Sequence, residues 1–126
     1  MRVHLVFCVV LFGLLTASAG LAQTEGPYID IMTVQVKFDK MADFESLTKK
    51  FVEVHRRTKA DYWVASESAY GEGGLVSFVS VRPKLAAIDT AMDASMKALA
   101  DAYGPAGMTK LFQDFGATVT RSRSEL

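Results

Sequence analysis

Several residue types that common functional sites require are scarce in this 126-residue chain. It contains one cysteine, two histidines and no asparagine. One cysteine cannot form a disulfide framework or a thiolate zinc site, and two histidines cannot form a cluster of several histidine ligands. Basic and acidic side chains balance at 14 each. Because the chain has no net charge to steer it towards nucleic acid or an anionic membrane surface, neither is an expected partner.

Long apolar runs are also absent, apart from one near the N-terminus. That run covers residues 5–15, which is too short for a membrane-spanning helix of about 20 residues. Arg2 precedes it, and small residues that include Ala19 and Ala22 follow it. This order is typical of a secretory signal that is cleaved after Ala19 or Ala22. We therefore expect residues 1–22 to be a cleavable signal peptide and the protein to be secreted or periplasmic, without stable membrane insertion; the alternative is an uncleaved anchor.

Residues 23–126 would form the exported domain. They contain no cysteine and a single histidine, His55. In an oxidising compartment, methionine would therefore be the main residue type open to oxidation. A chain of about 100 residues is long enough for one modest hydrophobic core. We expect one domain, with no metal and no bound cofactor.

Hydrophobic periodicity divides this domain into strands and helices. Apolar residues alternate with polar ones in the strands and recur at spacings of three and four in the helices. The predicted elements, in order, are a strand at Tyr28–Phe38, a helix capped by Asp39 that ends near Lys59, strands at Tyr62–Tyr70 and Leu75–Val81, a helix from Lys84 to Gly104, a short helix up to Gly116, and a weak strand from Ala117 to Leu126. Three glycines in residues 71–74 predict a hairpin turn between the second and third strands.

The order of these elements predicts an α+β fold of the ferredoxin-like β-α-β-β-α-β type. Such a domain has a four-stranded antiparallel sheet in the order 4-1-3-2, with two main helices on one face. The first and third strands, which are the most apolar ones here, would lie in the middle of that sheet.

The sheet face away from the helices is expected to be partly apolar. Whichever face that is, its apolar side chains come from a small set: Ile29, Ile31, Trp63 or Tyr62, and Val79 or Phe78. An apolar surface of this kind favours burial against a second copy of the chain, so we expect a homodimer.

The topology, the long first helix and the break at Gly104-Pro105 carry a resemblance to a known superfamily. Over roughly residues 28–124, the chain resembles the dimeric α/β-barrel superfamily, which includes antibiotic-biosynthesis-monooxygenase-like and NIPSNAP-like proteins. It looks closest to small secreted members of unassigned function. The resemblance implies that two ferredoxin-like sheets pack face to face into a barrel. The haem-degrading branch uses an Asn, a Trp and a His; this chain has no asparagine and its His55 lies on the first helix, so that site is not carried over.

Four side chains are candidates for ligand binding: Gln35, His55, Trp63 and Glu67. His55 titrates near neutral pH and lies at the border of the apolar helix stripe, where it either meets water or points into a cleft. Trp63 can stack on a planar ligand or pack in the core, and Glu67 shares its strand face. Gln35 lies on the mixed face of the first strand. If these faces line the barrel interior, the four side chains become the polar groups of an apolar pocket.

Other charged residues have simpler interpretations. Arg121 and Arg123 share one face of the last strand, where they either close the same pocket or lie on a solvated edge. Asp61 and four later aspartates are spaced like solvent-facing helix residues and not like the ligands of a calcium loop. No catalytic residue is assigned.

Two functions are compatible with these residues. The first is a binding or interaction module, a homodimer whose apolar interior accepts a small apolar molecule. The second is a cofactor-independent monooxygenase or isomerase that acts on a planar apolar substrate. A pocket of roughly 300 Å³ or more, lined by Trp63 together with His55 or Glu67, would favour the second function.

The predicted signal peptide leads to a direct measurement. When a secreting host expresses the chain, the exported protein should begin at Gly20 or Gln23, because signal peptidase requires small residues before the cut. Intact-mass determination of the exported material checks this, and a mass that includes Met1 would contradict it.

Overall fold

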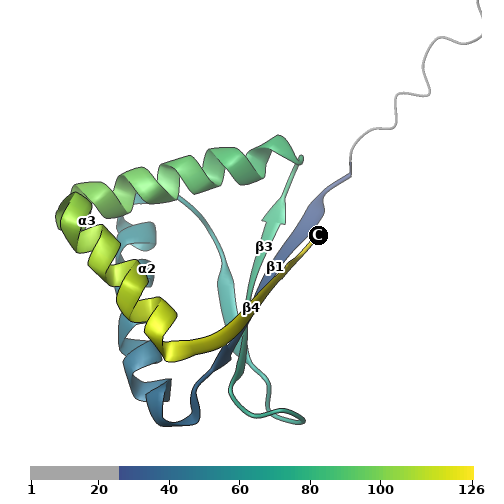
Figure 1. Ribbon diagram of the computed structural model, residues 1–126. Helices are drawn as coiled ribbons and strands as arrows, with labels where there is room; N and C mark the ends of the chain where they lie inside the picture. The colour runs from purple at the N-terminus through teal and green to yellow at the C-terminus, as the bar shows by residue number, and fades with distance from the viewer. Residues whose placement is uncertain (1–25) are drawn as a thin grey trace, which may run out of the picture.

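Strands and helices alternate along residues 26–126, the part of the chain that the computed structural model describes. The elements are β1 (Tyr28–Val36), a 3₁₀ turn η1 (Phe38–Lys40), α2 (Met41–Thr58), β2 (Val64–Glu67), β3 (Leu75–Arg82), α3 (Ala86–Thr118) and β4 (Val119–Glu125). Both helices lie on the same side of the sheet (Figure 1). The expected signal peptide, residues 1–22, lies outside the described residues.

The four strands form one antiparallel sheet in the order β2-β3-β1-β4. This is the order expected for a ferredoxin-like domain, so the predicted fold class is confirmed. Strand β1 lies in the centre, with Ile29 opposite Val81 on β3 and Gln35 opposite Arg121 on β4. Strands β2 and β4 form the two edges of the sheet.

The hydrophobic core fills the space between the sheet and the helices. Its first part consists of the buried side chains of Val34, Val36 and Val76 from the sheet and Phe44 from α2. Phe44 also stacks against Phe115 of α3, with ring centroids 5.2 Å apart. A second part lies between the helices and includes the buried side chains of Val54, Ala98, Leu99 and Leu111. The apolar face predicted for β1 is therefore the face that the helices cover.

Several predicted boundaries differ from the structure, most clearly around the start of α2 and along β2. Phe38 was expected as the last apolar residue of the first strand, but β1 ends at Val36 and Phe38 is fully exposed in η1. Asp39 also lies in η1, so it does not cap α2, which begins at Met41 without a side-chain cap. Strand β2 is shorter than predicted, because only residues 64–67 pair with β3.

The predicted helix break at Gly104-Pro105 is confirmed as a kink, at which two helical segments meet. Helix α3 runs through it to Thr118, with Gly104 in a non-helical conformation (φ 71°, ψ 164°). Glycine adopts this positive φ readily, and proline is accepted in the first turn of the helical segment that follows. The two segments of α3 consequently run in different directions (Figure 1).

The predicted glycine-rich turn connects β2 and β3 and depends most on Gly74. Its φ is +77°, and a Cβ atom added there would lie 2.9 Å from the Val36 carbonyl oxygen and 3.1 Å from Gln35 Nε2. The Gly74 carbonyl accepts a hydrogen bond of 2.8 Å from the Val36 amide. Only glycine therefore lets this turn approach the end of β1.

Replacing Gly74 by alanine should destabilise the fold by about 1–3 kcal/mol, because the side chain adds both a strained φ and a backbone clash. Chemical denaturation measures this difference. Gly73→Ala is the matched control, since nothing lies within 4 Å of a Cβ at Gly73. Equal stability of the two variants would contradict the role assigned to Gly74.

Candidate functional site

Three elements meet at the side chain of His55. The Trp63 indole, on the segment before β2, donates a hydrogen bond of 2.7 Å from Nε1 to His55 Nδ1. On the other side of the ring, His55 Nε2 lies 2.7 Å from Ser95 Oγ of α3. The indole nitrogen can only donate, so Nδ1 carries no proton. In the neutral ring the proton is then on Nε2, which donates to the Ser95 hydroxyl.

The environment of His55 favours this neutral form. The residue is 8% exposed, so the water-facing alternative for this border position is wrong. Burial lowers the pKa of His55 below its usual value of 6.5, and the negative charge of Asp61, which raises it, has the smaller effect. Trp63 packs edge-on against Phe78 with ring centroids 5.3 Å apart, as a core side chain does.

A serine beside a histidine can form a nucleophile and its general base, but this pair does not. The base needs a free nitrogen lone pair that accepts the serine proton. In His55 the lone pair on Nδ1 accepts from Trp63, and Nε2, the nitrogen next to Ser95, holds the proton. The three side chains therefore connect α2, α3 and the segment before β2, and they leave no group ready for proton transfer.

An ion cluster lies next to this network. Arg82, 9% exposed at the end of β3, donates to both carboxylate oxygens of Asp61, at 2.5 and 3.1 Å, and reaches Asp30 of β1 at 3.2 Å. The hydrogen bond to Asp61 is the main reason that the pKa of Arg82 is raised. Asp61 was expected to face solvent from a helix; it lies instead after α2, where it ties the segment that carries Trp63 to the sheet.

The sequence interpretation missed Ser95, Arg82 and Asp30. Alternation along β3 was the available signal for Arg82, because it places this residue on the same face as buried Val76 and Ser80. The partners of Arg82 lie 21 and 52 residues away in the sequence, and no local pattern identifies them.

The structure brings together two of the four predicted ligand-binding residues. His55 and Trp63 are in contact on the helix side of the sheet. Gln35 is on the opposite face, where its Nε2 donates to the Gly73 carbonyl at 2.7 Å and its Oε1 is buried without a partner among the described residues. Glu67 lies exposed at the far end of β2. Binding of a ligand by these four residues remains a prediction.

The two arginines of β4 have charged partners on the surface. Arg121 pairs with Glu72 at 2.8 Å, and Arg123 pairs with Glu125 of the same strand. All four side chains are largely exposed. Of the two interpretations, this geometry favours the solvated edge.

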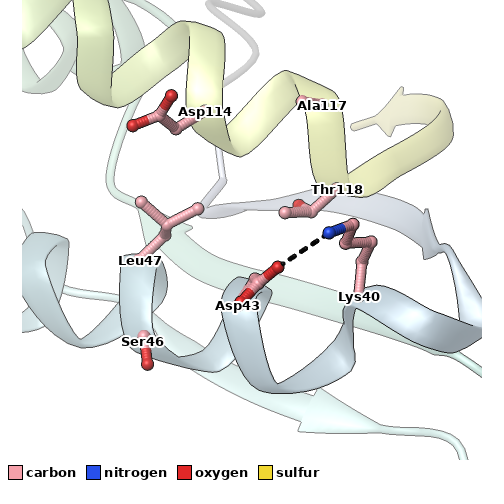
Figure 2. A pocket seen from close by; sticks show the side chains of 7 residues that line it. All are labelled: Lys40, Asp43, Ser46, Leu47, Asp114, Ala117 and Thr118. Carbon is pink, nitrogen blue, oxygen red and sulfur yellow. Dashed lines mark hydrogen bonds and ion pairs between the residues drawn. The ribbon is translucent and has the colours of Figure 1, made fainter.

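Two open grooves flank α2. The larger, of about 370 Å³, lies between the start of α2 and the end of α3 (Figure 2). It is lined by Lys40, Asp43, Ser46, Leu47, Asp114, Ala117 and Thr118. Lys40 and Asp43 neutralise each other there in an ion pair of 3.1 Å.

The smaller groove, of about 280 Å³, lies between α2 and strands β2 and β3. It is lined by Met41, Phe44, Glu45, Thr48, Lys49, Val52, Ala65, Ser66, Glu67 and Val76. Of the predicted ligand-binding residues, Glu67 lines this groove, whereas His55 and Trp63 line neither groove.

No three histidine, cysteine, aspartate or glutamate side chains within residues 26–126 are grouped as ligands for a metal ion. No helix in the same range is both long enough and apolar enough to cross a membrane.

Comparison with known proteins finds similar structures but no match by sequence. No protein-family model and no curated protein matches the chain. A NIPSNAP family protein from Agrobacterium tumefaciens matches 80% of this chain and 83% of its own, with 10% identity and a TM-score of 0.60. A conserved protein from Methanosarcina mazei matches 82% and 92%, with 11% identity and a TM-score of 0.56.

An antibiotic biosynthesis monooxygenase-like protein from Caulobacter crescentus matches 81% of this chain and 88% of its own, with 16% identity and a TM-score of 0.53. The resemblance to NIPSNAP-like and antibiotic-biosynthesis-monooxygenase-like proteins is thus confirmed at the level of the fold. Identities this low show the ferredoxin-like fold alone, and a fold does not fix a function.

The buried His55 predicts how stability depends on pH. Its pKa is lowered in the folded state, so the unfolded chain binds more protons as the pH falls through 6.5. The free energy of unfolding should therefore decrease as the pH is lowered from about 7.5 to 5.5, above the usual range of carboxylates. Urea denaturation at several pH values measures this slope.

His55→Gln is the informative variant, because His55 is the one histidine within residues 26–126. It should lower stability at pH 7.5 and remove most of the slope between pH 7.5 and 5.5. An unchanged slope in this variant would show that another group carries the dependence.

Proposed function

We propose that the protein is an exported, homodimeric α/β-barrel protein that acts as a binding or interaction module. The observation that carries the proposal is an apolar patch on the sheet face that the helices leave open. A module of this kind needs a surface that a second copy covers and an interior that forms between the two copies.

The open-face patch consists of Ile29 and Ile31 of β1, Val64 of β2, and Val79 and Val81 of β3. Ile29 lies opposite Val81, and Val79 lies opposite both Ile31 and Val64, so the five side chains are neighbours. Ile29, Val64 and Val81 are 55%, 51% and 67% exposed in the single chain. Neighbouring apolar side chains exposed to this extent favour association through this face.

The same face becomes polar towards the glycine-rich turn. The hydroxyls of Thr33 and Ser77 lie 3.1 Å apart, and Gln35 and Arg121 follow on adjacent strands. Two sheets packed face to face would enclose both regions, which gives an apolar interior with a few polar groups.

Binding is a better fit than catalysis to the groups present. The monooxygenase or isomerase alternative was tied to a pocket of roughly 300 Å³ lined by Trp63 with His55 or Glu67. The groove that contains Glu67 measures about 280 Å³, and Trp63 is not part of its lining. Because His55 uses both ring nitrogens in hydrogen bonds, it offers a substrate neither an acid nor a base. Export enters the proposal through the predicted signal peptide, residues 1–22.

The dimer should form in the micromolar range and should depend on the open-face patch. Val81→Lys places a charge within the patch and should weaken association at least tenfold, because the charge must be desolvated without a partner. Sedimentation velocity over a concentration series measures the association.

Met92→Lys is the matched control, since Met92 of α3 is 60% exposed but lies on the helix side of the molecule. It should leave association unchanged. A wild-type protein that sediments as a monomer throughout, or two variants that behave alike, would contradict the proposed dimer.

A further inference from the structure

The free edge of β2 presents unpaired backbone groups beside a groove. The Ser68 amide donates to the Leu75 carbonyl at 3.0 Å, so these two residues form a hydrogen-bonded pair. Hydrogen-bonded and non-hydrogen-bonded pairs alternate along an antiparallel ladder. By the register of β2 and β3, Ser66 pairs with Ser77 through hydrogen bonds, whereas Ala65 and Glu67 do not bond to β3. Their N–H and C=O groups point outwards.

Both Ala65 and Glu67 also line the smaller groove, on the side where α2 runs past the edge. We propose that this edge and groove bind an extended peptide, which adds to the sheet as a fifth strand next to β2 and inserts an apolar side chain under α2. The inference rests on the proposed binding function and names its partner as a peptide. Strand addition of this type takes its affinity from main-chain hydrogen bonds and its specificity from the side-chain pocket.

The groove offers an apolar surface to a side chain of the peptide. Its apolar part is formed by Met41, Phe44, Val52 and Val76, and Phe44 and Val76 are buried. Its volume of about 280 Å³ exceeds that of a single side chain, so it leaves room for an apolar residue of the peptide and part of a neighbouring one. The Thr48 hydroxyl in the lining is buried without a hydrogen-bond partner among the described residues.

The charges around the groove select a basic peptide. Glu45 and Glu67 provide two carboxylates, and Lys49 provides one ammonium group. Within residues 26–126, none of the three takes part in an ion pair. A peptide with a lysine or arginine close to its apolar side chain would compensate the excess negative charge.

The opposite edge of the sheet is protected in a way that β2 is not. Strand β4 carries Arg121 and Arg123, each with an acidic partner, and charged side chains on an edge discourage further pairing. Within β2, Glu67 is the one charged residue of four, and all four are exposed. The β2 edge is short and carries a single charge, so a peptide that also gains the groove can pair there.

The test starts from a displayed library of random heptapeptides, panned on the purified full-length protein. The most enriched sequence is then synthesised, and its affinity is measured by fluorescence anisotropy. We expect enriched peptides to combine an apolar residue with a basic one. On binding, the amides of Ala65 and Glu67 should become protected from hydrogen exchange, whereas the Ser66 amide, already bonded to β3, should change little.

Two variants separate the edge from the groove charge. Ala65→Pro removes an N–H group that points away from β3 and leaves the hydrogen bonds to β3 in place. It should therefore lower the affinity for the peptide at least tenfold. Glu67→Lys should abolish the preference for basic peptides. Glu125→Lys makes the same charge change on β4, and it should alter neither the peptide affinity nor the preference for basic peptides. Circular dichroism checks that each variant is folded.

Each other result overturns the peptide site. Failure to enrich any peptide, or an affinity that Ala65→Pro does not change, would show that no strand adds at β2. Protection of Ala65 and Glu67 in the peptide-free protein, lost on dilution, would show that a second copy occupies the edge. Sedimentation tests the dimer independently of peptide binding. A protein that dimerises but binds no peptide would contradict only this inference, and a monomer that binds peptide would contradict only the proposed dimer.

Discussion

Strand β1 is apolar along one face and, in its first half, on the other face as well, and the helices cover only the first of these faces. Val34 and Val36 are buried beneath α2 and α3, whereas Ile29 on the other face is 55% exposed. A central strand of this kind leaves apolar area in water unless another surface covers it. The central position of β1, the burial of one of its faces under both helices and the open-face patch agree with this constraint, and the proposed dimer would cover the remaining apolar area.

Polar contacts fix the position of the segment between α2 and β2. Arg82 forms an ion pair with Asp61. Trp63, two residues after Asp61, donates a hydrogen bond to His55. A buried arginine with two carboxylate partners stabilises little by itself, but removal of one partner leaves a buried charge uncompensated. These contacts therefore set where the edge strand β2 begins, and with it the groove beside α2.

Periodicity predicts most of this fold, because each element has one face in the core. The element order could be predicted in this way. The sheet order followed from the fold type that this element order implies, and the kink followed from Gly104-Pro105. The network around His55 could not be predicted, since Ser95 lies 40 residues from His55 and the partners of Arg82 lie 21 and 52 residues from it. Gln35 and Glu67 were grouped with His55 and Trp63 by strand alternation alone. Alternation separates the two faces of one strand, but it does not show which of them lies on the same side of the sheet as a given face of another strand.

The central claim is that a second copy covers the open face, and hydroxyl-radical footprinting across a dilution series tests it most directly. Ile29, Val64 and Val81 should be protected at micromolar concentration and become reactive on dilution. Leu85 at the start of α3, 47% exposed, provides the internal reference and should react equally throughout. Reactivity of the three open-face residues that matches their single-chain exposure at every concentration would contradict the claim.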